Sequence, residues 1–345
     1  MSVAIGAPRR GISGRLTFGL VAGLIVLVLV WTALWFYAAH QTAAVVDGWL
    51  VREASFGRQW TCPDREISGY PFQMRLTCAE PRYAGRDGQG QVKAFRAHAE
   101  IWSPTRITAE VDGPLIAQSP DGAQHVEANW AQSSIVLQGS PSTLRGAAIA
   151  FDQPNINLTA PHVQLNSKAE HALVTLAPSA KPGADDKTFD LHVKLDSVGL
   201  PDLDRLTGNN GPVDFETSGT INALDLGGKA TPIERLEDWR ASDGTVRINN
   251  FLFIKGPIKI AAEGDVSLDP QHRPAGKIDV SMIGMEPLLA ALHVPTQMLG
   301  FTALLGGKPV GHLDGQGKSI DLPVTLHDGN ISIGPATVAR LAPLY

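Results

Sequence analysis

The stretch that decides the fold class of this chain is Asp190-Leu191-His192-Val193-Lys194-Leu195-Asp196. Polar and apolar residues alternate through it without a break, so one face of the segment is apolar and the other is polar. A period of two is typical of a β-strand that is buried on one face, as in antiparallel sheets. This segment therefore predicts an antiparallel sheet with one face against a core.

The same alternation recurs along most of the chain after residue 67. It is found at 107–111, 155–159, 162–166, 264–269, 277–282 and 330–333. Turn-forming Asp-Gly pairs separate the segments at 112–113, 121–122, 243–244 and 328–329. The spacing predicts about fifteen to twenty strands, as in sandwiches and barrels.

A few helices are expected to interrupt the strands. Residues 231–239 predict a short helix with Pro232 at its first position. Two more are predicted at 285–292 and from Thr296 to about residue 305. The fold class is therefore mainly β, with an elongated, curled, mostly antiparallel sheet or sandwich. The Pro-, Ala- and Asp-rich segment 178–188 is the best candidate for a division of this β-rich part into two halves.

The N-terminal part of the chain has a different pattern. Residues 16–39 contain no charge and would form a helix of about 36 Å, enough to span a ~30 Å hydrocarbon core. The aromatic residues Trp31, Trp35 and Tyr37 gather at the C-terminal end, where amphipathic rings suit the headgroup region. This pattern predicts a transmembrane helix.

The flanking charges predict how that helix is oriented. Arg9, Arg10 and Arg15 precede the span, which favours a cytoplasmic N-terminus at 1–15. We expect a bacterial inner-membrane protein with a transmembrane helix at 16–39, a helical connector at 40–60 and a periplasmic β-rich domain at 61–345. The small-residue stretch after residue 37 leaves a cleaved signal peptide open as an alternative, although the apolar run is longer than such peptides need.

The chain has two cysteines, Cys62 and Cys78. In an oxidising compartment, such a close pair favours a disulfide, which would stabilise the fold by roughly 3 kcal/mol in the chain-entropy model. Free thiols are the alternative. A zinc or redox site fits less well, because no histidine lies beside the cysteines and they do not form a C-x-x-C motif.

Motifs for chemistry are scarce. The sequence has no G-x-S-x-G, S-x-x-K or H-E-x-x-H pattern, so we expect no catalytic residue, no metal site and no cofactor. The net charge is −5, with 34 acidic and 29 basic residues and no basic run, which argues against a nucleic-acid partner. We expect that the protein is not an enzyme.

One segment between the cysteines stands out, and it reads Ile67-Ser68-Gly69-Tyr70-Pro71-Phe72. Gly69 permits an unusual backbone angle, and Pro71 fixes one. We interpret the segment as the turn of a locked first hairpin, with the rings of Tyr70 and Phe72 in the core. A gate over a ligand site is the alternative.

These residues carry a family resemblance. The six-residue segment, bracketed by Cys62 and Cys78 soon after a single anchor, resembles the uncharacterised bacterial family called domain of unknown function 2125. A second stretch is similar to it as well, namely Leu322-Pro323-Val324-Thr325-Leu326-His327-Asp328-Gly329-Asn330-Ile331-Ser332-Ile333-Gly334-Pro335. The family implies no catalytic residue. Residues 262–269 and 276–280 also resemble repeats of AsmA-like envelope proteins, which implies long, groove-forming sheets associated with outer-membrane assembly and lipid traffic.

Three functions follow as hypotheses. The first is a non-enzymatic envelope protein that binds or shields lipid or another amphiphile between apolar sheet faces; a closed core without a cavity is the alternative for the same pattern. The second is a scaffold or assembly factor that binds another envelope protein through a sheet edge. The third is a periplasmic hydrolase with an unrecognised site.

Overall fold

The computed structural model describes residues 14–140, 143–161, 163–227, 231–284, 309–310, 313, 319–334 and 336–345. In this part of the chain it has three helices and two antiparallel β-sheets. The fold is mainly β with an N-terminal apolar helix, as predicted. The two helices predicted between residues 285 and 305 lie outside the described residues.

Helix α1 (Gly14–Ser55) is continuous through the predicted transmembrane segment and most of the connector. It is long and apolar enough to cross a membrane, and its apolar side chains are largely exposed. Helix α1 ends at Ser55, and the first strand, β1 (Gln59–Thr61), begins within the last residues of the expected connector.

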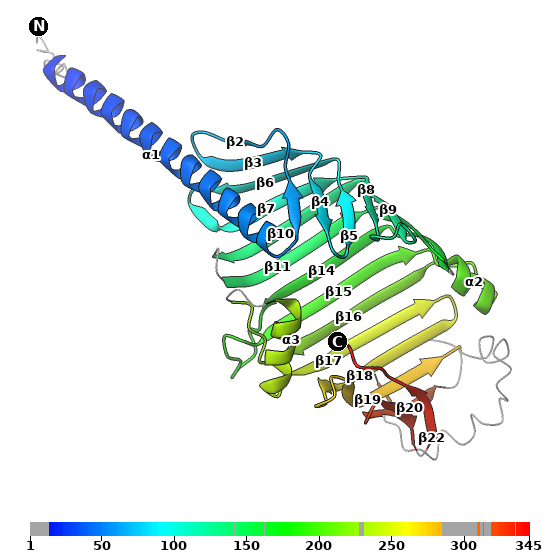
Figure 1. Ribbon diagram of the computed structural model, residues 1–345. Coiled ribbons are helices and arrows are strands. Elements are labelled where there is room, and N and C mark those ends of the chain that lie inside the picture. The colour runs from blue at the N-terminus through cyan, green and yellow to red at the C-terminus, as the bar shows by residue number, and fades with distance from the viewer. Residues whose placement is uncertain are drawn as a thin grey trace, which may run out of the picture.

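The larger sheet contains fifteen strands among the described residues, and each neighbouring pair is antiparallel (Figure 1). Its strands, in spatial order, are β2 (Glu66–Ser68), β3 (Gln73–Ala79), β6 (Ala94–Glu100), β7 (Ser103–Asp112), β10 (Gln132–Ser140), β11 (Thr143–Asp152), β14 (His171–Pro178), β15 (Phe189–Val198), β16 (Val213–Ile221), β17 (Thr245–Lys255), β18 (Ile258–Leu268), β19 (Pro274–Ile283), β20 (Ile320–His327), β21 (Asn330–Ile333) and β22 (Ala336–Arg340).

The smaller sheet has seven strands and covers the N-terminal part of the larger one (Figure 1). Its spatial order is β1, β4 (Arg82–Gly85), β5 (Gly88–Gln91), β8 (Leu115–Gln118), β9 (His125–Asn129), β12 (Asn155–Ala160) and β13 (Val163–Lys168). The described residues thus form 22 strands, more than the fifteen to twenty predicted. Several small-sheet strands have only three or four residues, too few to show a clear alternation.

The two sheets are two arms of one bent structure. Between residues 79 and 171 the chain passes repeatedly from one sheet to the other through two-residue corners, such as Gly113-Pro114 between β7 and β8. Main-chain hydrogen bonds continue around the bend, for example from Lys93 N to Asp112 O at 3.1 Å and from Gln153 N to Glu170 O at 2.9 Å. The arms therefore meet along a line of corners and face each other beyond it.

Two short helices lie at the ends of the later strands. Helix α3 (Pro232–Ala241) confirms the prediction at 231–239: Thr231 caps it, with a reciprocal capping box to Glu234. Helix α2 (Pro201–Thr207) was not predicted. The segment 178–188 joins β14 to β15, which pair with each other in the large sheet. The proposed division of the domain at this segment stays a prediction.

Candidate ligand-binding cavity

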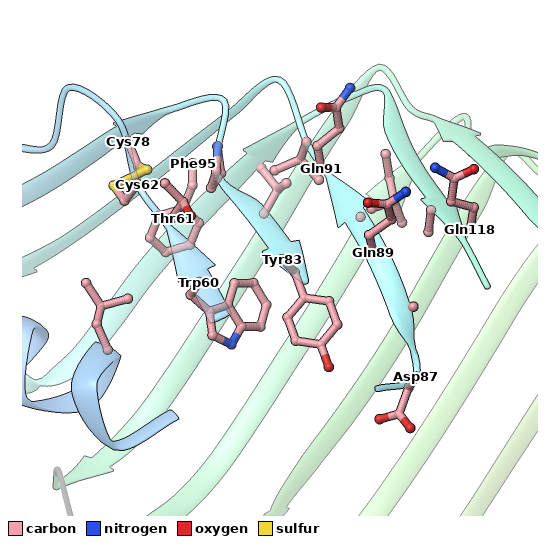
Figure 2. A pocket seen from close by; sticks show the side chains of 18 of the residues that line it. Trp60, Thr61, Cys62, Cys78, Tyr83, Asp87, Gln89, Gln91, Phe95 and Gln118 are labelled. Atoms are coloured by element: carbon pink, nitrogen blue, oxygen red, sulfur yellow. A yellow bond between two sulfur atoms is a disulfide. The ribbon is translucent and has the colours of Figure 1, made fainter. Parts of the chain in front are cut away.

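A cavity of about 850 Å³ lies between the two arms, next to the C-terminal half of α1 (Figure 2). Strands of both sheets line it, and α1 forms one side wall. Its volume lies in the range of roughly 300–1,000 Å³ typical of small-molecule sites. This is the candidate functional site.

The large sheet supplies one wall from strands β3, β6 and β7. Leu76 and Cys78 line the cavity from β3, Phe95 from β6 and Val111 from β7. Phe95 lies directly opposite both Cys78 and Val111 in the strand register, so these side chains share the inner face. The alternation that builds the strands thus gives this wall its apolar character.

The other wall belongs to the small sheet. Trp60 and Tyr83 are register partners with ring centroids 4.8 Å apart, and Figure 2 shows both rings on the cavity side. Ala117 and Val126 continue the wall as register partners on β8 and β9. The neighbouring Ile116 lines a groove on the opposite face of this sheet.

Helix α1 closes the side of the cavity with Val46, Trp49 and Leu50. The ring of Trp49 lies 5.8 Å from that of Trp60, which joins the helix to the small sheet. The C-terminal part of α1 therefore packs on the β-rich domain through these three residues.

The cavity has an apolar apex and more polar residues at its free edge. Pro81, Val92 and Leu115 lie at or beside the corners where the arms meet. At the other end Asp87 and the 119–124 turn, which carries Ser119 and Gln124, belong to the tips of the small-sheet hairpins. This gradient suits a ligand with an apolar tail and a polar end.

The apolar inner face continues across the large sheet beyond the cavity. Register pairs carry it from Ala109 to Ile135, then Ile149, Val174 and Val193 on successive strands. From β15 to β22 the small sheet has no counterpart strands in the described residues. The face is therefore a long apolar track of which the cavity occupies one end.

The outer face of the same strands is charged. Arg96, next to Phe95 in sequence, makes two 2.7 Å hydrogen bonds to the carboxylate of Asp112. This hydrogen bonding lowers the pKa of Asp112, so the pair stays ionised at neutral pH. The two faces of this sheet thus differ sharply in polarity.

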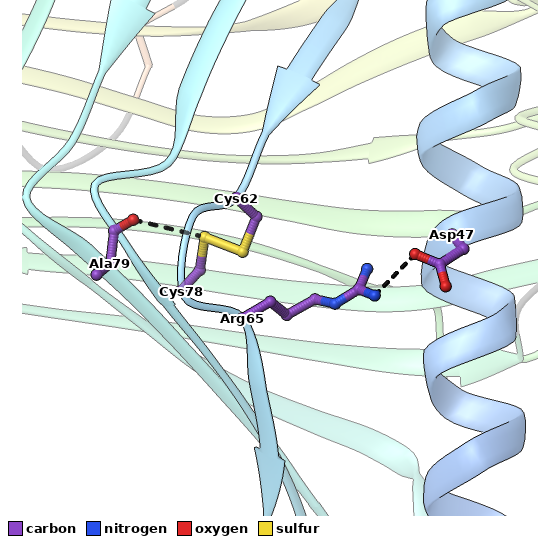
Figure 3. Close-up of a disulfide and its surroundings, with 5 residues drawn as sticks. All are labelled: Asp47, Cys62, Arg65, Cys78 and Ala79. Carbon is purple, nitrogen blue, oxygen red and sulfur yellow. Dashed lines mark hydrogen bonds and ion pairs between the residues drawn. A yellow bond between two sulfur atoms is a disulfide. The ribbon is translucent and has the colours of Figure 1, made fainter.

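Cys62 and Cys78 form a disulfide, as predicted (Figure 3). Cys62 follows β1 of the small sheet, and Cys78 belongs to β3 of the large sheet, so the bond ties the two arms together beside the cavity. Arg65, three residues after Cys62, forms a 2.7 Å ion pair with Asp47 of α1. The disulfide and the ion pair fix the cavity wall to both the sheet and the helix.

The predicted position of the aromatic motif was wrong in one respect. Ile67 and Ser68 lie in β2, and Gly69 begins the β2–β3 turn as expected, but Tyr70 and Phe72 are not in the core: they are 46% and 56% exposed. Tyr70 packs on Trp35 of α1 and Phe72 packs on Trp102 of the β6–β7 turn, and neither residue lines the cavity. The sequence also did not point to Trp60, Tyr83, Phe95 or Val111, although aromatic residues close to both cysteines were a usable signal.

In the described residues no group of three or more His, Cys, Asp or Glu side chains is placed to hold a metal ion. The absence of catalytic residues, metal and cofactor stays a prediction. The site is a cavity with an apolar interior and hydrogen-bonding groups near its edge. A cavity of this kind can hold an apolar group by removing its surface from water.

These features define a class: a predominantly β protein with one N-terminal helix able to span a membrane, a disulfide between two sheets and an apolar cavity. The family described as uncharacterized protein conserved in bacteria (DUF2125) matches residues 35–342. The chain belongs to this family, and the matched region includes the cavity, the disulfide and the aromatic motif. Searches of curated proteins and of solved structures find no match.

Proposed function

We propose that this protein is a membrane-anchored, periplasmic, non-enzymatic protein that binds a lipid or another amphiphile in envelope maintenance, with the acyl chain between the two arms. The observation that carries the proposal is the apolar cavity formed by Trp60, Tyr83, Phe95 and Val111 beside α1. Each methylene group that leaves water in such a site contributes about 0.8 kcal/mol. The more polar edge suits the headgroup.

The compartment is supported by two features. A disulfide persists in an oxidising environment, and the arginines before the apolar span favour a cytoplasmic N-terminus. A periplasm-active reporter fused after Tyr345 is expected to be active. Activity of a cytoplasmic reporter at the same position, with a silent periplasmic one, would reverse the orientation.

The long inner face agrees with the resemblance to AsmA-like proteins, whose sheets form grooves. Apolar side chains continue along this face from the cavity as far as Val193, so an amphiphile can move along it without leaving apolar contact. We therefore include transport or sensing of the amphiphile in the proposal.

The binding proposal is tested by photocrosslinking. The full chain, in nanodiscs of phosphatidylethanolamine and phosphatidylglycerol, is exposed to a diazirine-labelled palmitate. We expect crosslinks in the peptides of β5, β6 and β8. Ala117→Trp, which fills the cavity, should reduce this labelling at least about tenfold, the equivalent of about 1.4 kcal/mol.

Ile116→Trp is the matched control, because it adds the same ring to the opposite face of the same strand. Its labelling should match that of the natural chain. Crosslinks confined to α1 in all three proteins would show that the cavity takes no acyl chain.

The non-enzymatic part of the proposal has its own test. A fluorophosphonate probe is expected to label no serine of the full chain. Reproducible labelling of a single serine, lost when that serine is replaced by alanine, would contradict the non-enzymatic proposal and support the hydrolase hypothesis.

A scaffold function is favoured by one observation. Strand β22 is the last in the large sheet among the described residues, and all five of its residues are exposed. An edge of this kind can pair with a strand of another protein. Purification of one stoichiometric envelope protein without lipid, lost on replacing Val338 by Pro, would favour this function.

A further inference from the structure

The turn of the first hairpin is fastened to the apolar part of α1. The indole nitrogen of Trp35 donates a 3.1 Å hydrogen bond to Gln73 O. Thr32 lies 2.8 Å from the Tyr70 hydroxyl, and since the Thr32 hydroxyl also lies 2.8 Å from Val28 O, Tyr70 is the natural donor to Thr32. The ring of Tyr70 meets that of Trp35 edge to face, 5.6 Å between centroids.

These contacts place the turn at a definite height along the helix. The predicted transmembrane segment ends at Ala39, so Trp35 lies about 6 Å inside its end at a rise of about 1.5 Å per residue. If α1 spans a membrane with this segment, the turn lies at the level of the headgroups and the first methylene groups. Figure 1 shows the β2–β3 turn alongside α1, away from the helix's junction with β1.

The same place carries aromatic residues that are largely exposed in the part of the chain that the structure describes. Phe72 packs at 6.2 Å against Trp102 of the neighbouring β6–β7 turn, and Trp102 is 66% exposed. The main chain joins the two turns, because Ile101 N donates to Phe72 O at 3.2 Å. The Trp102 indole nitrogen reaches Glu100 at 2.6 Å, so the ring has one polar edge and one bare apolar face.

Aromatic rings of this kind prefer the membrane–water interface, where one end is apolar and the other is hydrated. We propose that Tyr70, Phe72 and Trp102 form a membrane-docking surface that inserts into the headgroup region of the leaflet on the domain side. The occupant is the lipid surface of the bilayer that α1 crosses, because the surface is continuous with the helix through Trp31, Thr32 and Trp35. The domain then lies against the membrane at this edge rather than standing away on a flexible stalk.

This inference rests on the membrane anchoring in the proposed function but not on a ligand in the cavity. It is tested in the full chain in phosphatidylethanolamine–phosphatidylglycerol vesicles. Single cysteines are introduced as Phe72→Cys and Trp102→Cys and labelled with the fluorophore NBD without reductant. Both native cysteines are bonded to each other, so only the introduced thiol reacts.

We expect the emission of both labels to be lost on adding lipids that carry a nitroxide at the headgroup, and to be less affected by a nitroxide deep in the acyl chain. Leu27→Cys, at the centre of the span, should show the reverse order. Val338→Cys, exposed on β22, should be quenched by neither lipid.

Labels at 72 and 102 that behave like the label at 338, while Leu27→Cys is quenched, would overturn the docking surface and leave the anchor intact. If Leu27→Cys is not quenched either, the anchor itself fails, and the docking surface fails with it. Using two separate turns guards against a local effect of either substitution on folding.

Discussion

The indole nitrogen of Trp31 in α1 donates a 3.1 Å hydrogen bond to the main-chain oxygen of Pro71, forty residues further along the chain. Pro71 lies between Tyr70 and Phe72. Because the acceptor is the main-chain oxygen, this hydrogen bond does not depend on which side chains the turn carries. Together with the bond from Trp35 to Gln73 O, it holds the first hairpin along the helix. The helix is therefore part of the domain's structure, in addition to any role as an anchor.

We predict that Trp35→Phe destabilises the fold by about 1–3 kcal/mol. The substitution keeps an aromatic ring but removes the indole N–H that donates to the main-chain oxygen of Gln73. Trp35 is only 7% exposed, so water cannot easily replace the lost donor. Urea unfolding of the full chain in micelles measures the change. Trp102→Phe is the matched control, because its indole bonds an exposed carboxylate, and its midpoint should shift little. Equal shifts for the two variants would contradict a specific role for Trp35.

We predict that replacing both cysteines by alanine lowers the free energy of unfolding by about 3 kcal/mol, as expected for a closed loop of this size. The loss should be accompanied by opening of the cavity edge, since the bond joins β3 to the segment after β1. Hydrogen exchange of the 59–65 peptide measures this opening. Unchanged protection of that peptide in the double variant would show that its contacts with α1, including the ion pair between Arg65 and Asp47, hold this segment in place without the disulfide.

A third prediction concerns the Lys255 side chain, which is fully buried at the end of β17 under α2. Its ammonium group donates to Asp204 at 2.5 Å and to Gly211 O at 2.8 Å. Asp204→Ala leaves a buried charge without its partner and should cost about 3–5 kcal/mol. Lys255→Met removes that charge and should cost much less, because hydrophobic replacement of a buried ion is often close to neutral.

The control for this pair is Asp202→Ala. Asp202 lies on the same helix but forms an exposed ion pair with Arg205, so its loss should cost less than about 1 kcal/mol. Thermal unfolding of the three variants in micelles provides the comparison. A cost for Asp204→Ala no greater than that for Asp202→Ala would mean that the Lys255 ammonium finds water or another acceptor.

The fold class was predictable because alternation reports which face of a strand is buried. It predicted β15 and β19 well, and Pro232 predicted the start of α3. Alternation does not report which strand pairs with which, so the division into two sheets was not predictable. Asp112-Gly113-Pro114 resembles a hairpin turn in sequence, but β7 and β8 belong to different sheets, and this segment forms a corner between them.

The site was predictable only in part, for a related reason. The Cys62–Cys78 disulfide was predictable because it depends on an oxidising compartment and on a short separation along the chain, and both can be inferred from the sequence. Trp60 and Tyr83 lie on strands of three and four residues, which carry no readable period. Tyr70 and Phe72 were assigned to the core because large apolar rings are expected to avoid water, but Tyr70 packs on Trp35 of α1, Phe72 packs on Trp102, and both residues stay exposed.

The C-terminal residue gives a prediction about acid. The Tyr345 hydroxyl donates a 2.8 Å hydrogen bond to Glu237 of α3, and the Tyr345 ring stacks on His272 at 4.4 Å. Hydrogen bonds from Arg240 and then from Tyr345 lower the pKa of Glu237 from 4.5 to about 2. The part of this lowering that comes from Tyr345 exists only while the C-terminus is docked, so the charged carboxylate stabilises the docked C-terminus, and this contribution is lost as the pH falls toward 2.

Hydrogen exchange of the 341–345 peptide, corrected for the intrinsic rate at each pH, measures the docking through the Leu344 amide, which donates to His272 O at 3.0 Å. We expect protection to fall as the pH drops from about 4.5 toward 2. Glu237→Gln should weaken protection at neutral pH and remove most of its pH dependence. Tyr345→Phe keeps the stacked ring but removes the hydroxyl, so it should lose part of the protection and most of its pH dependence, because the Arg240–Glu237 pair lies within α3 and does not depend on docking of the C-terminus. A pH dependence that is unchanged in Glu237→Gln would assign the acid effect to another group.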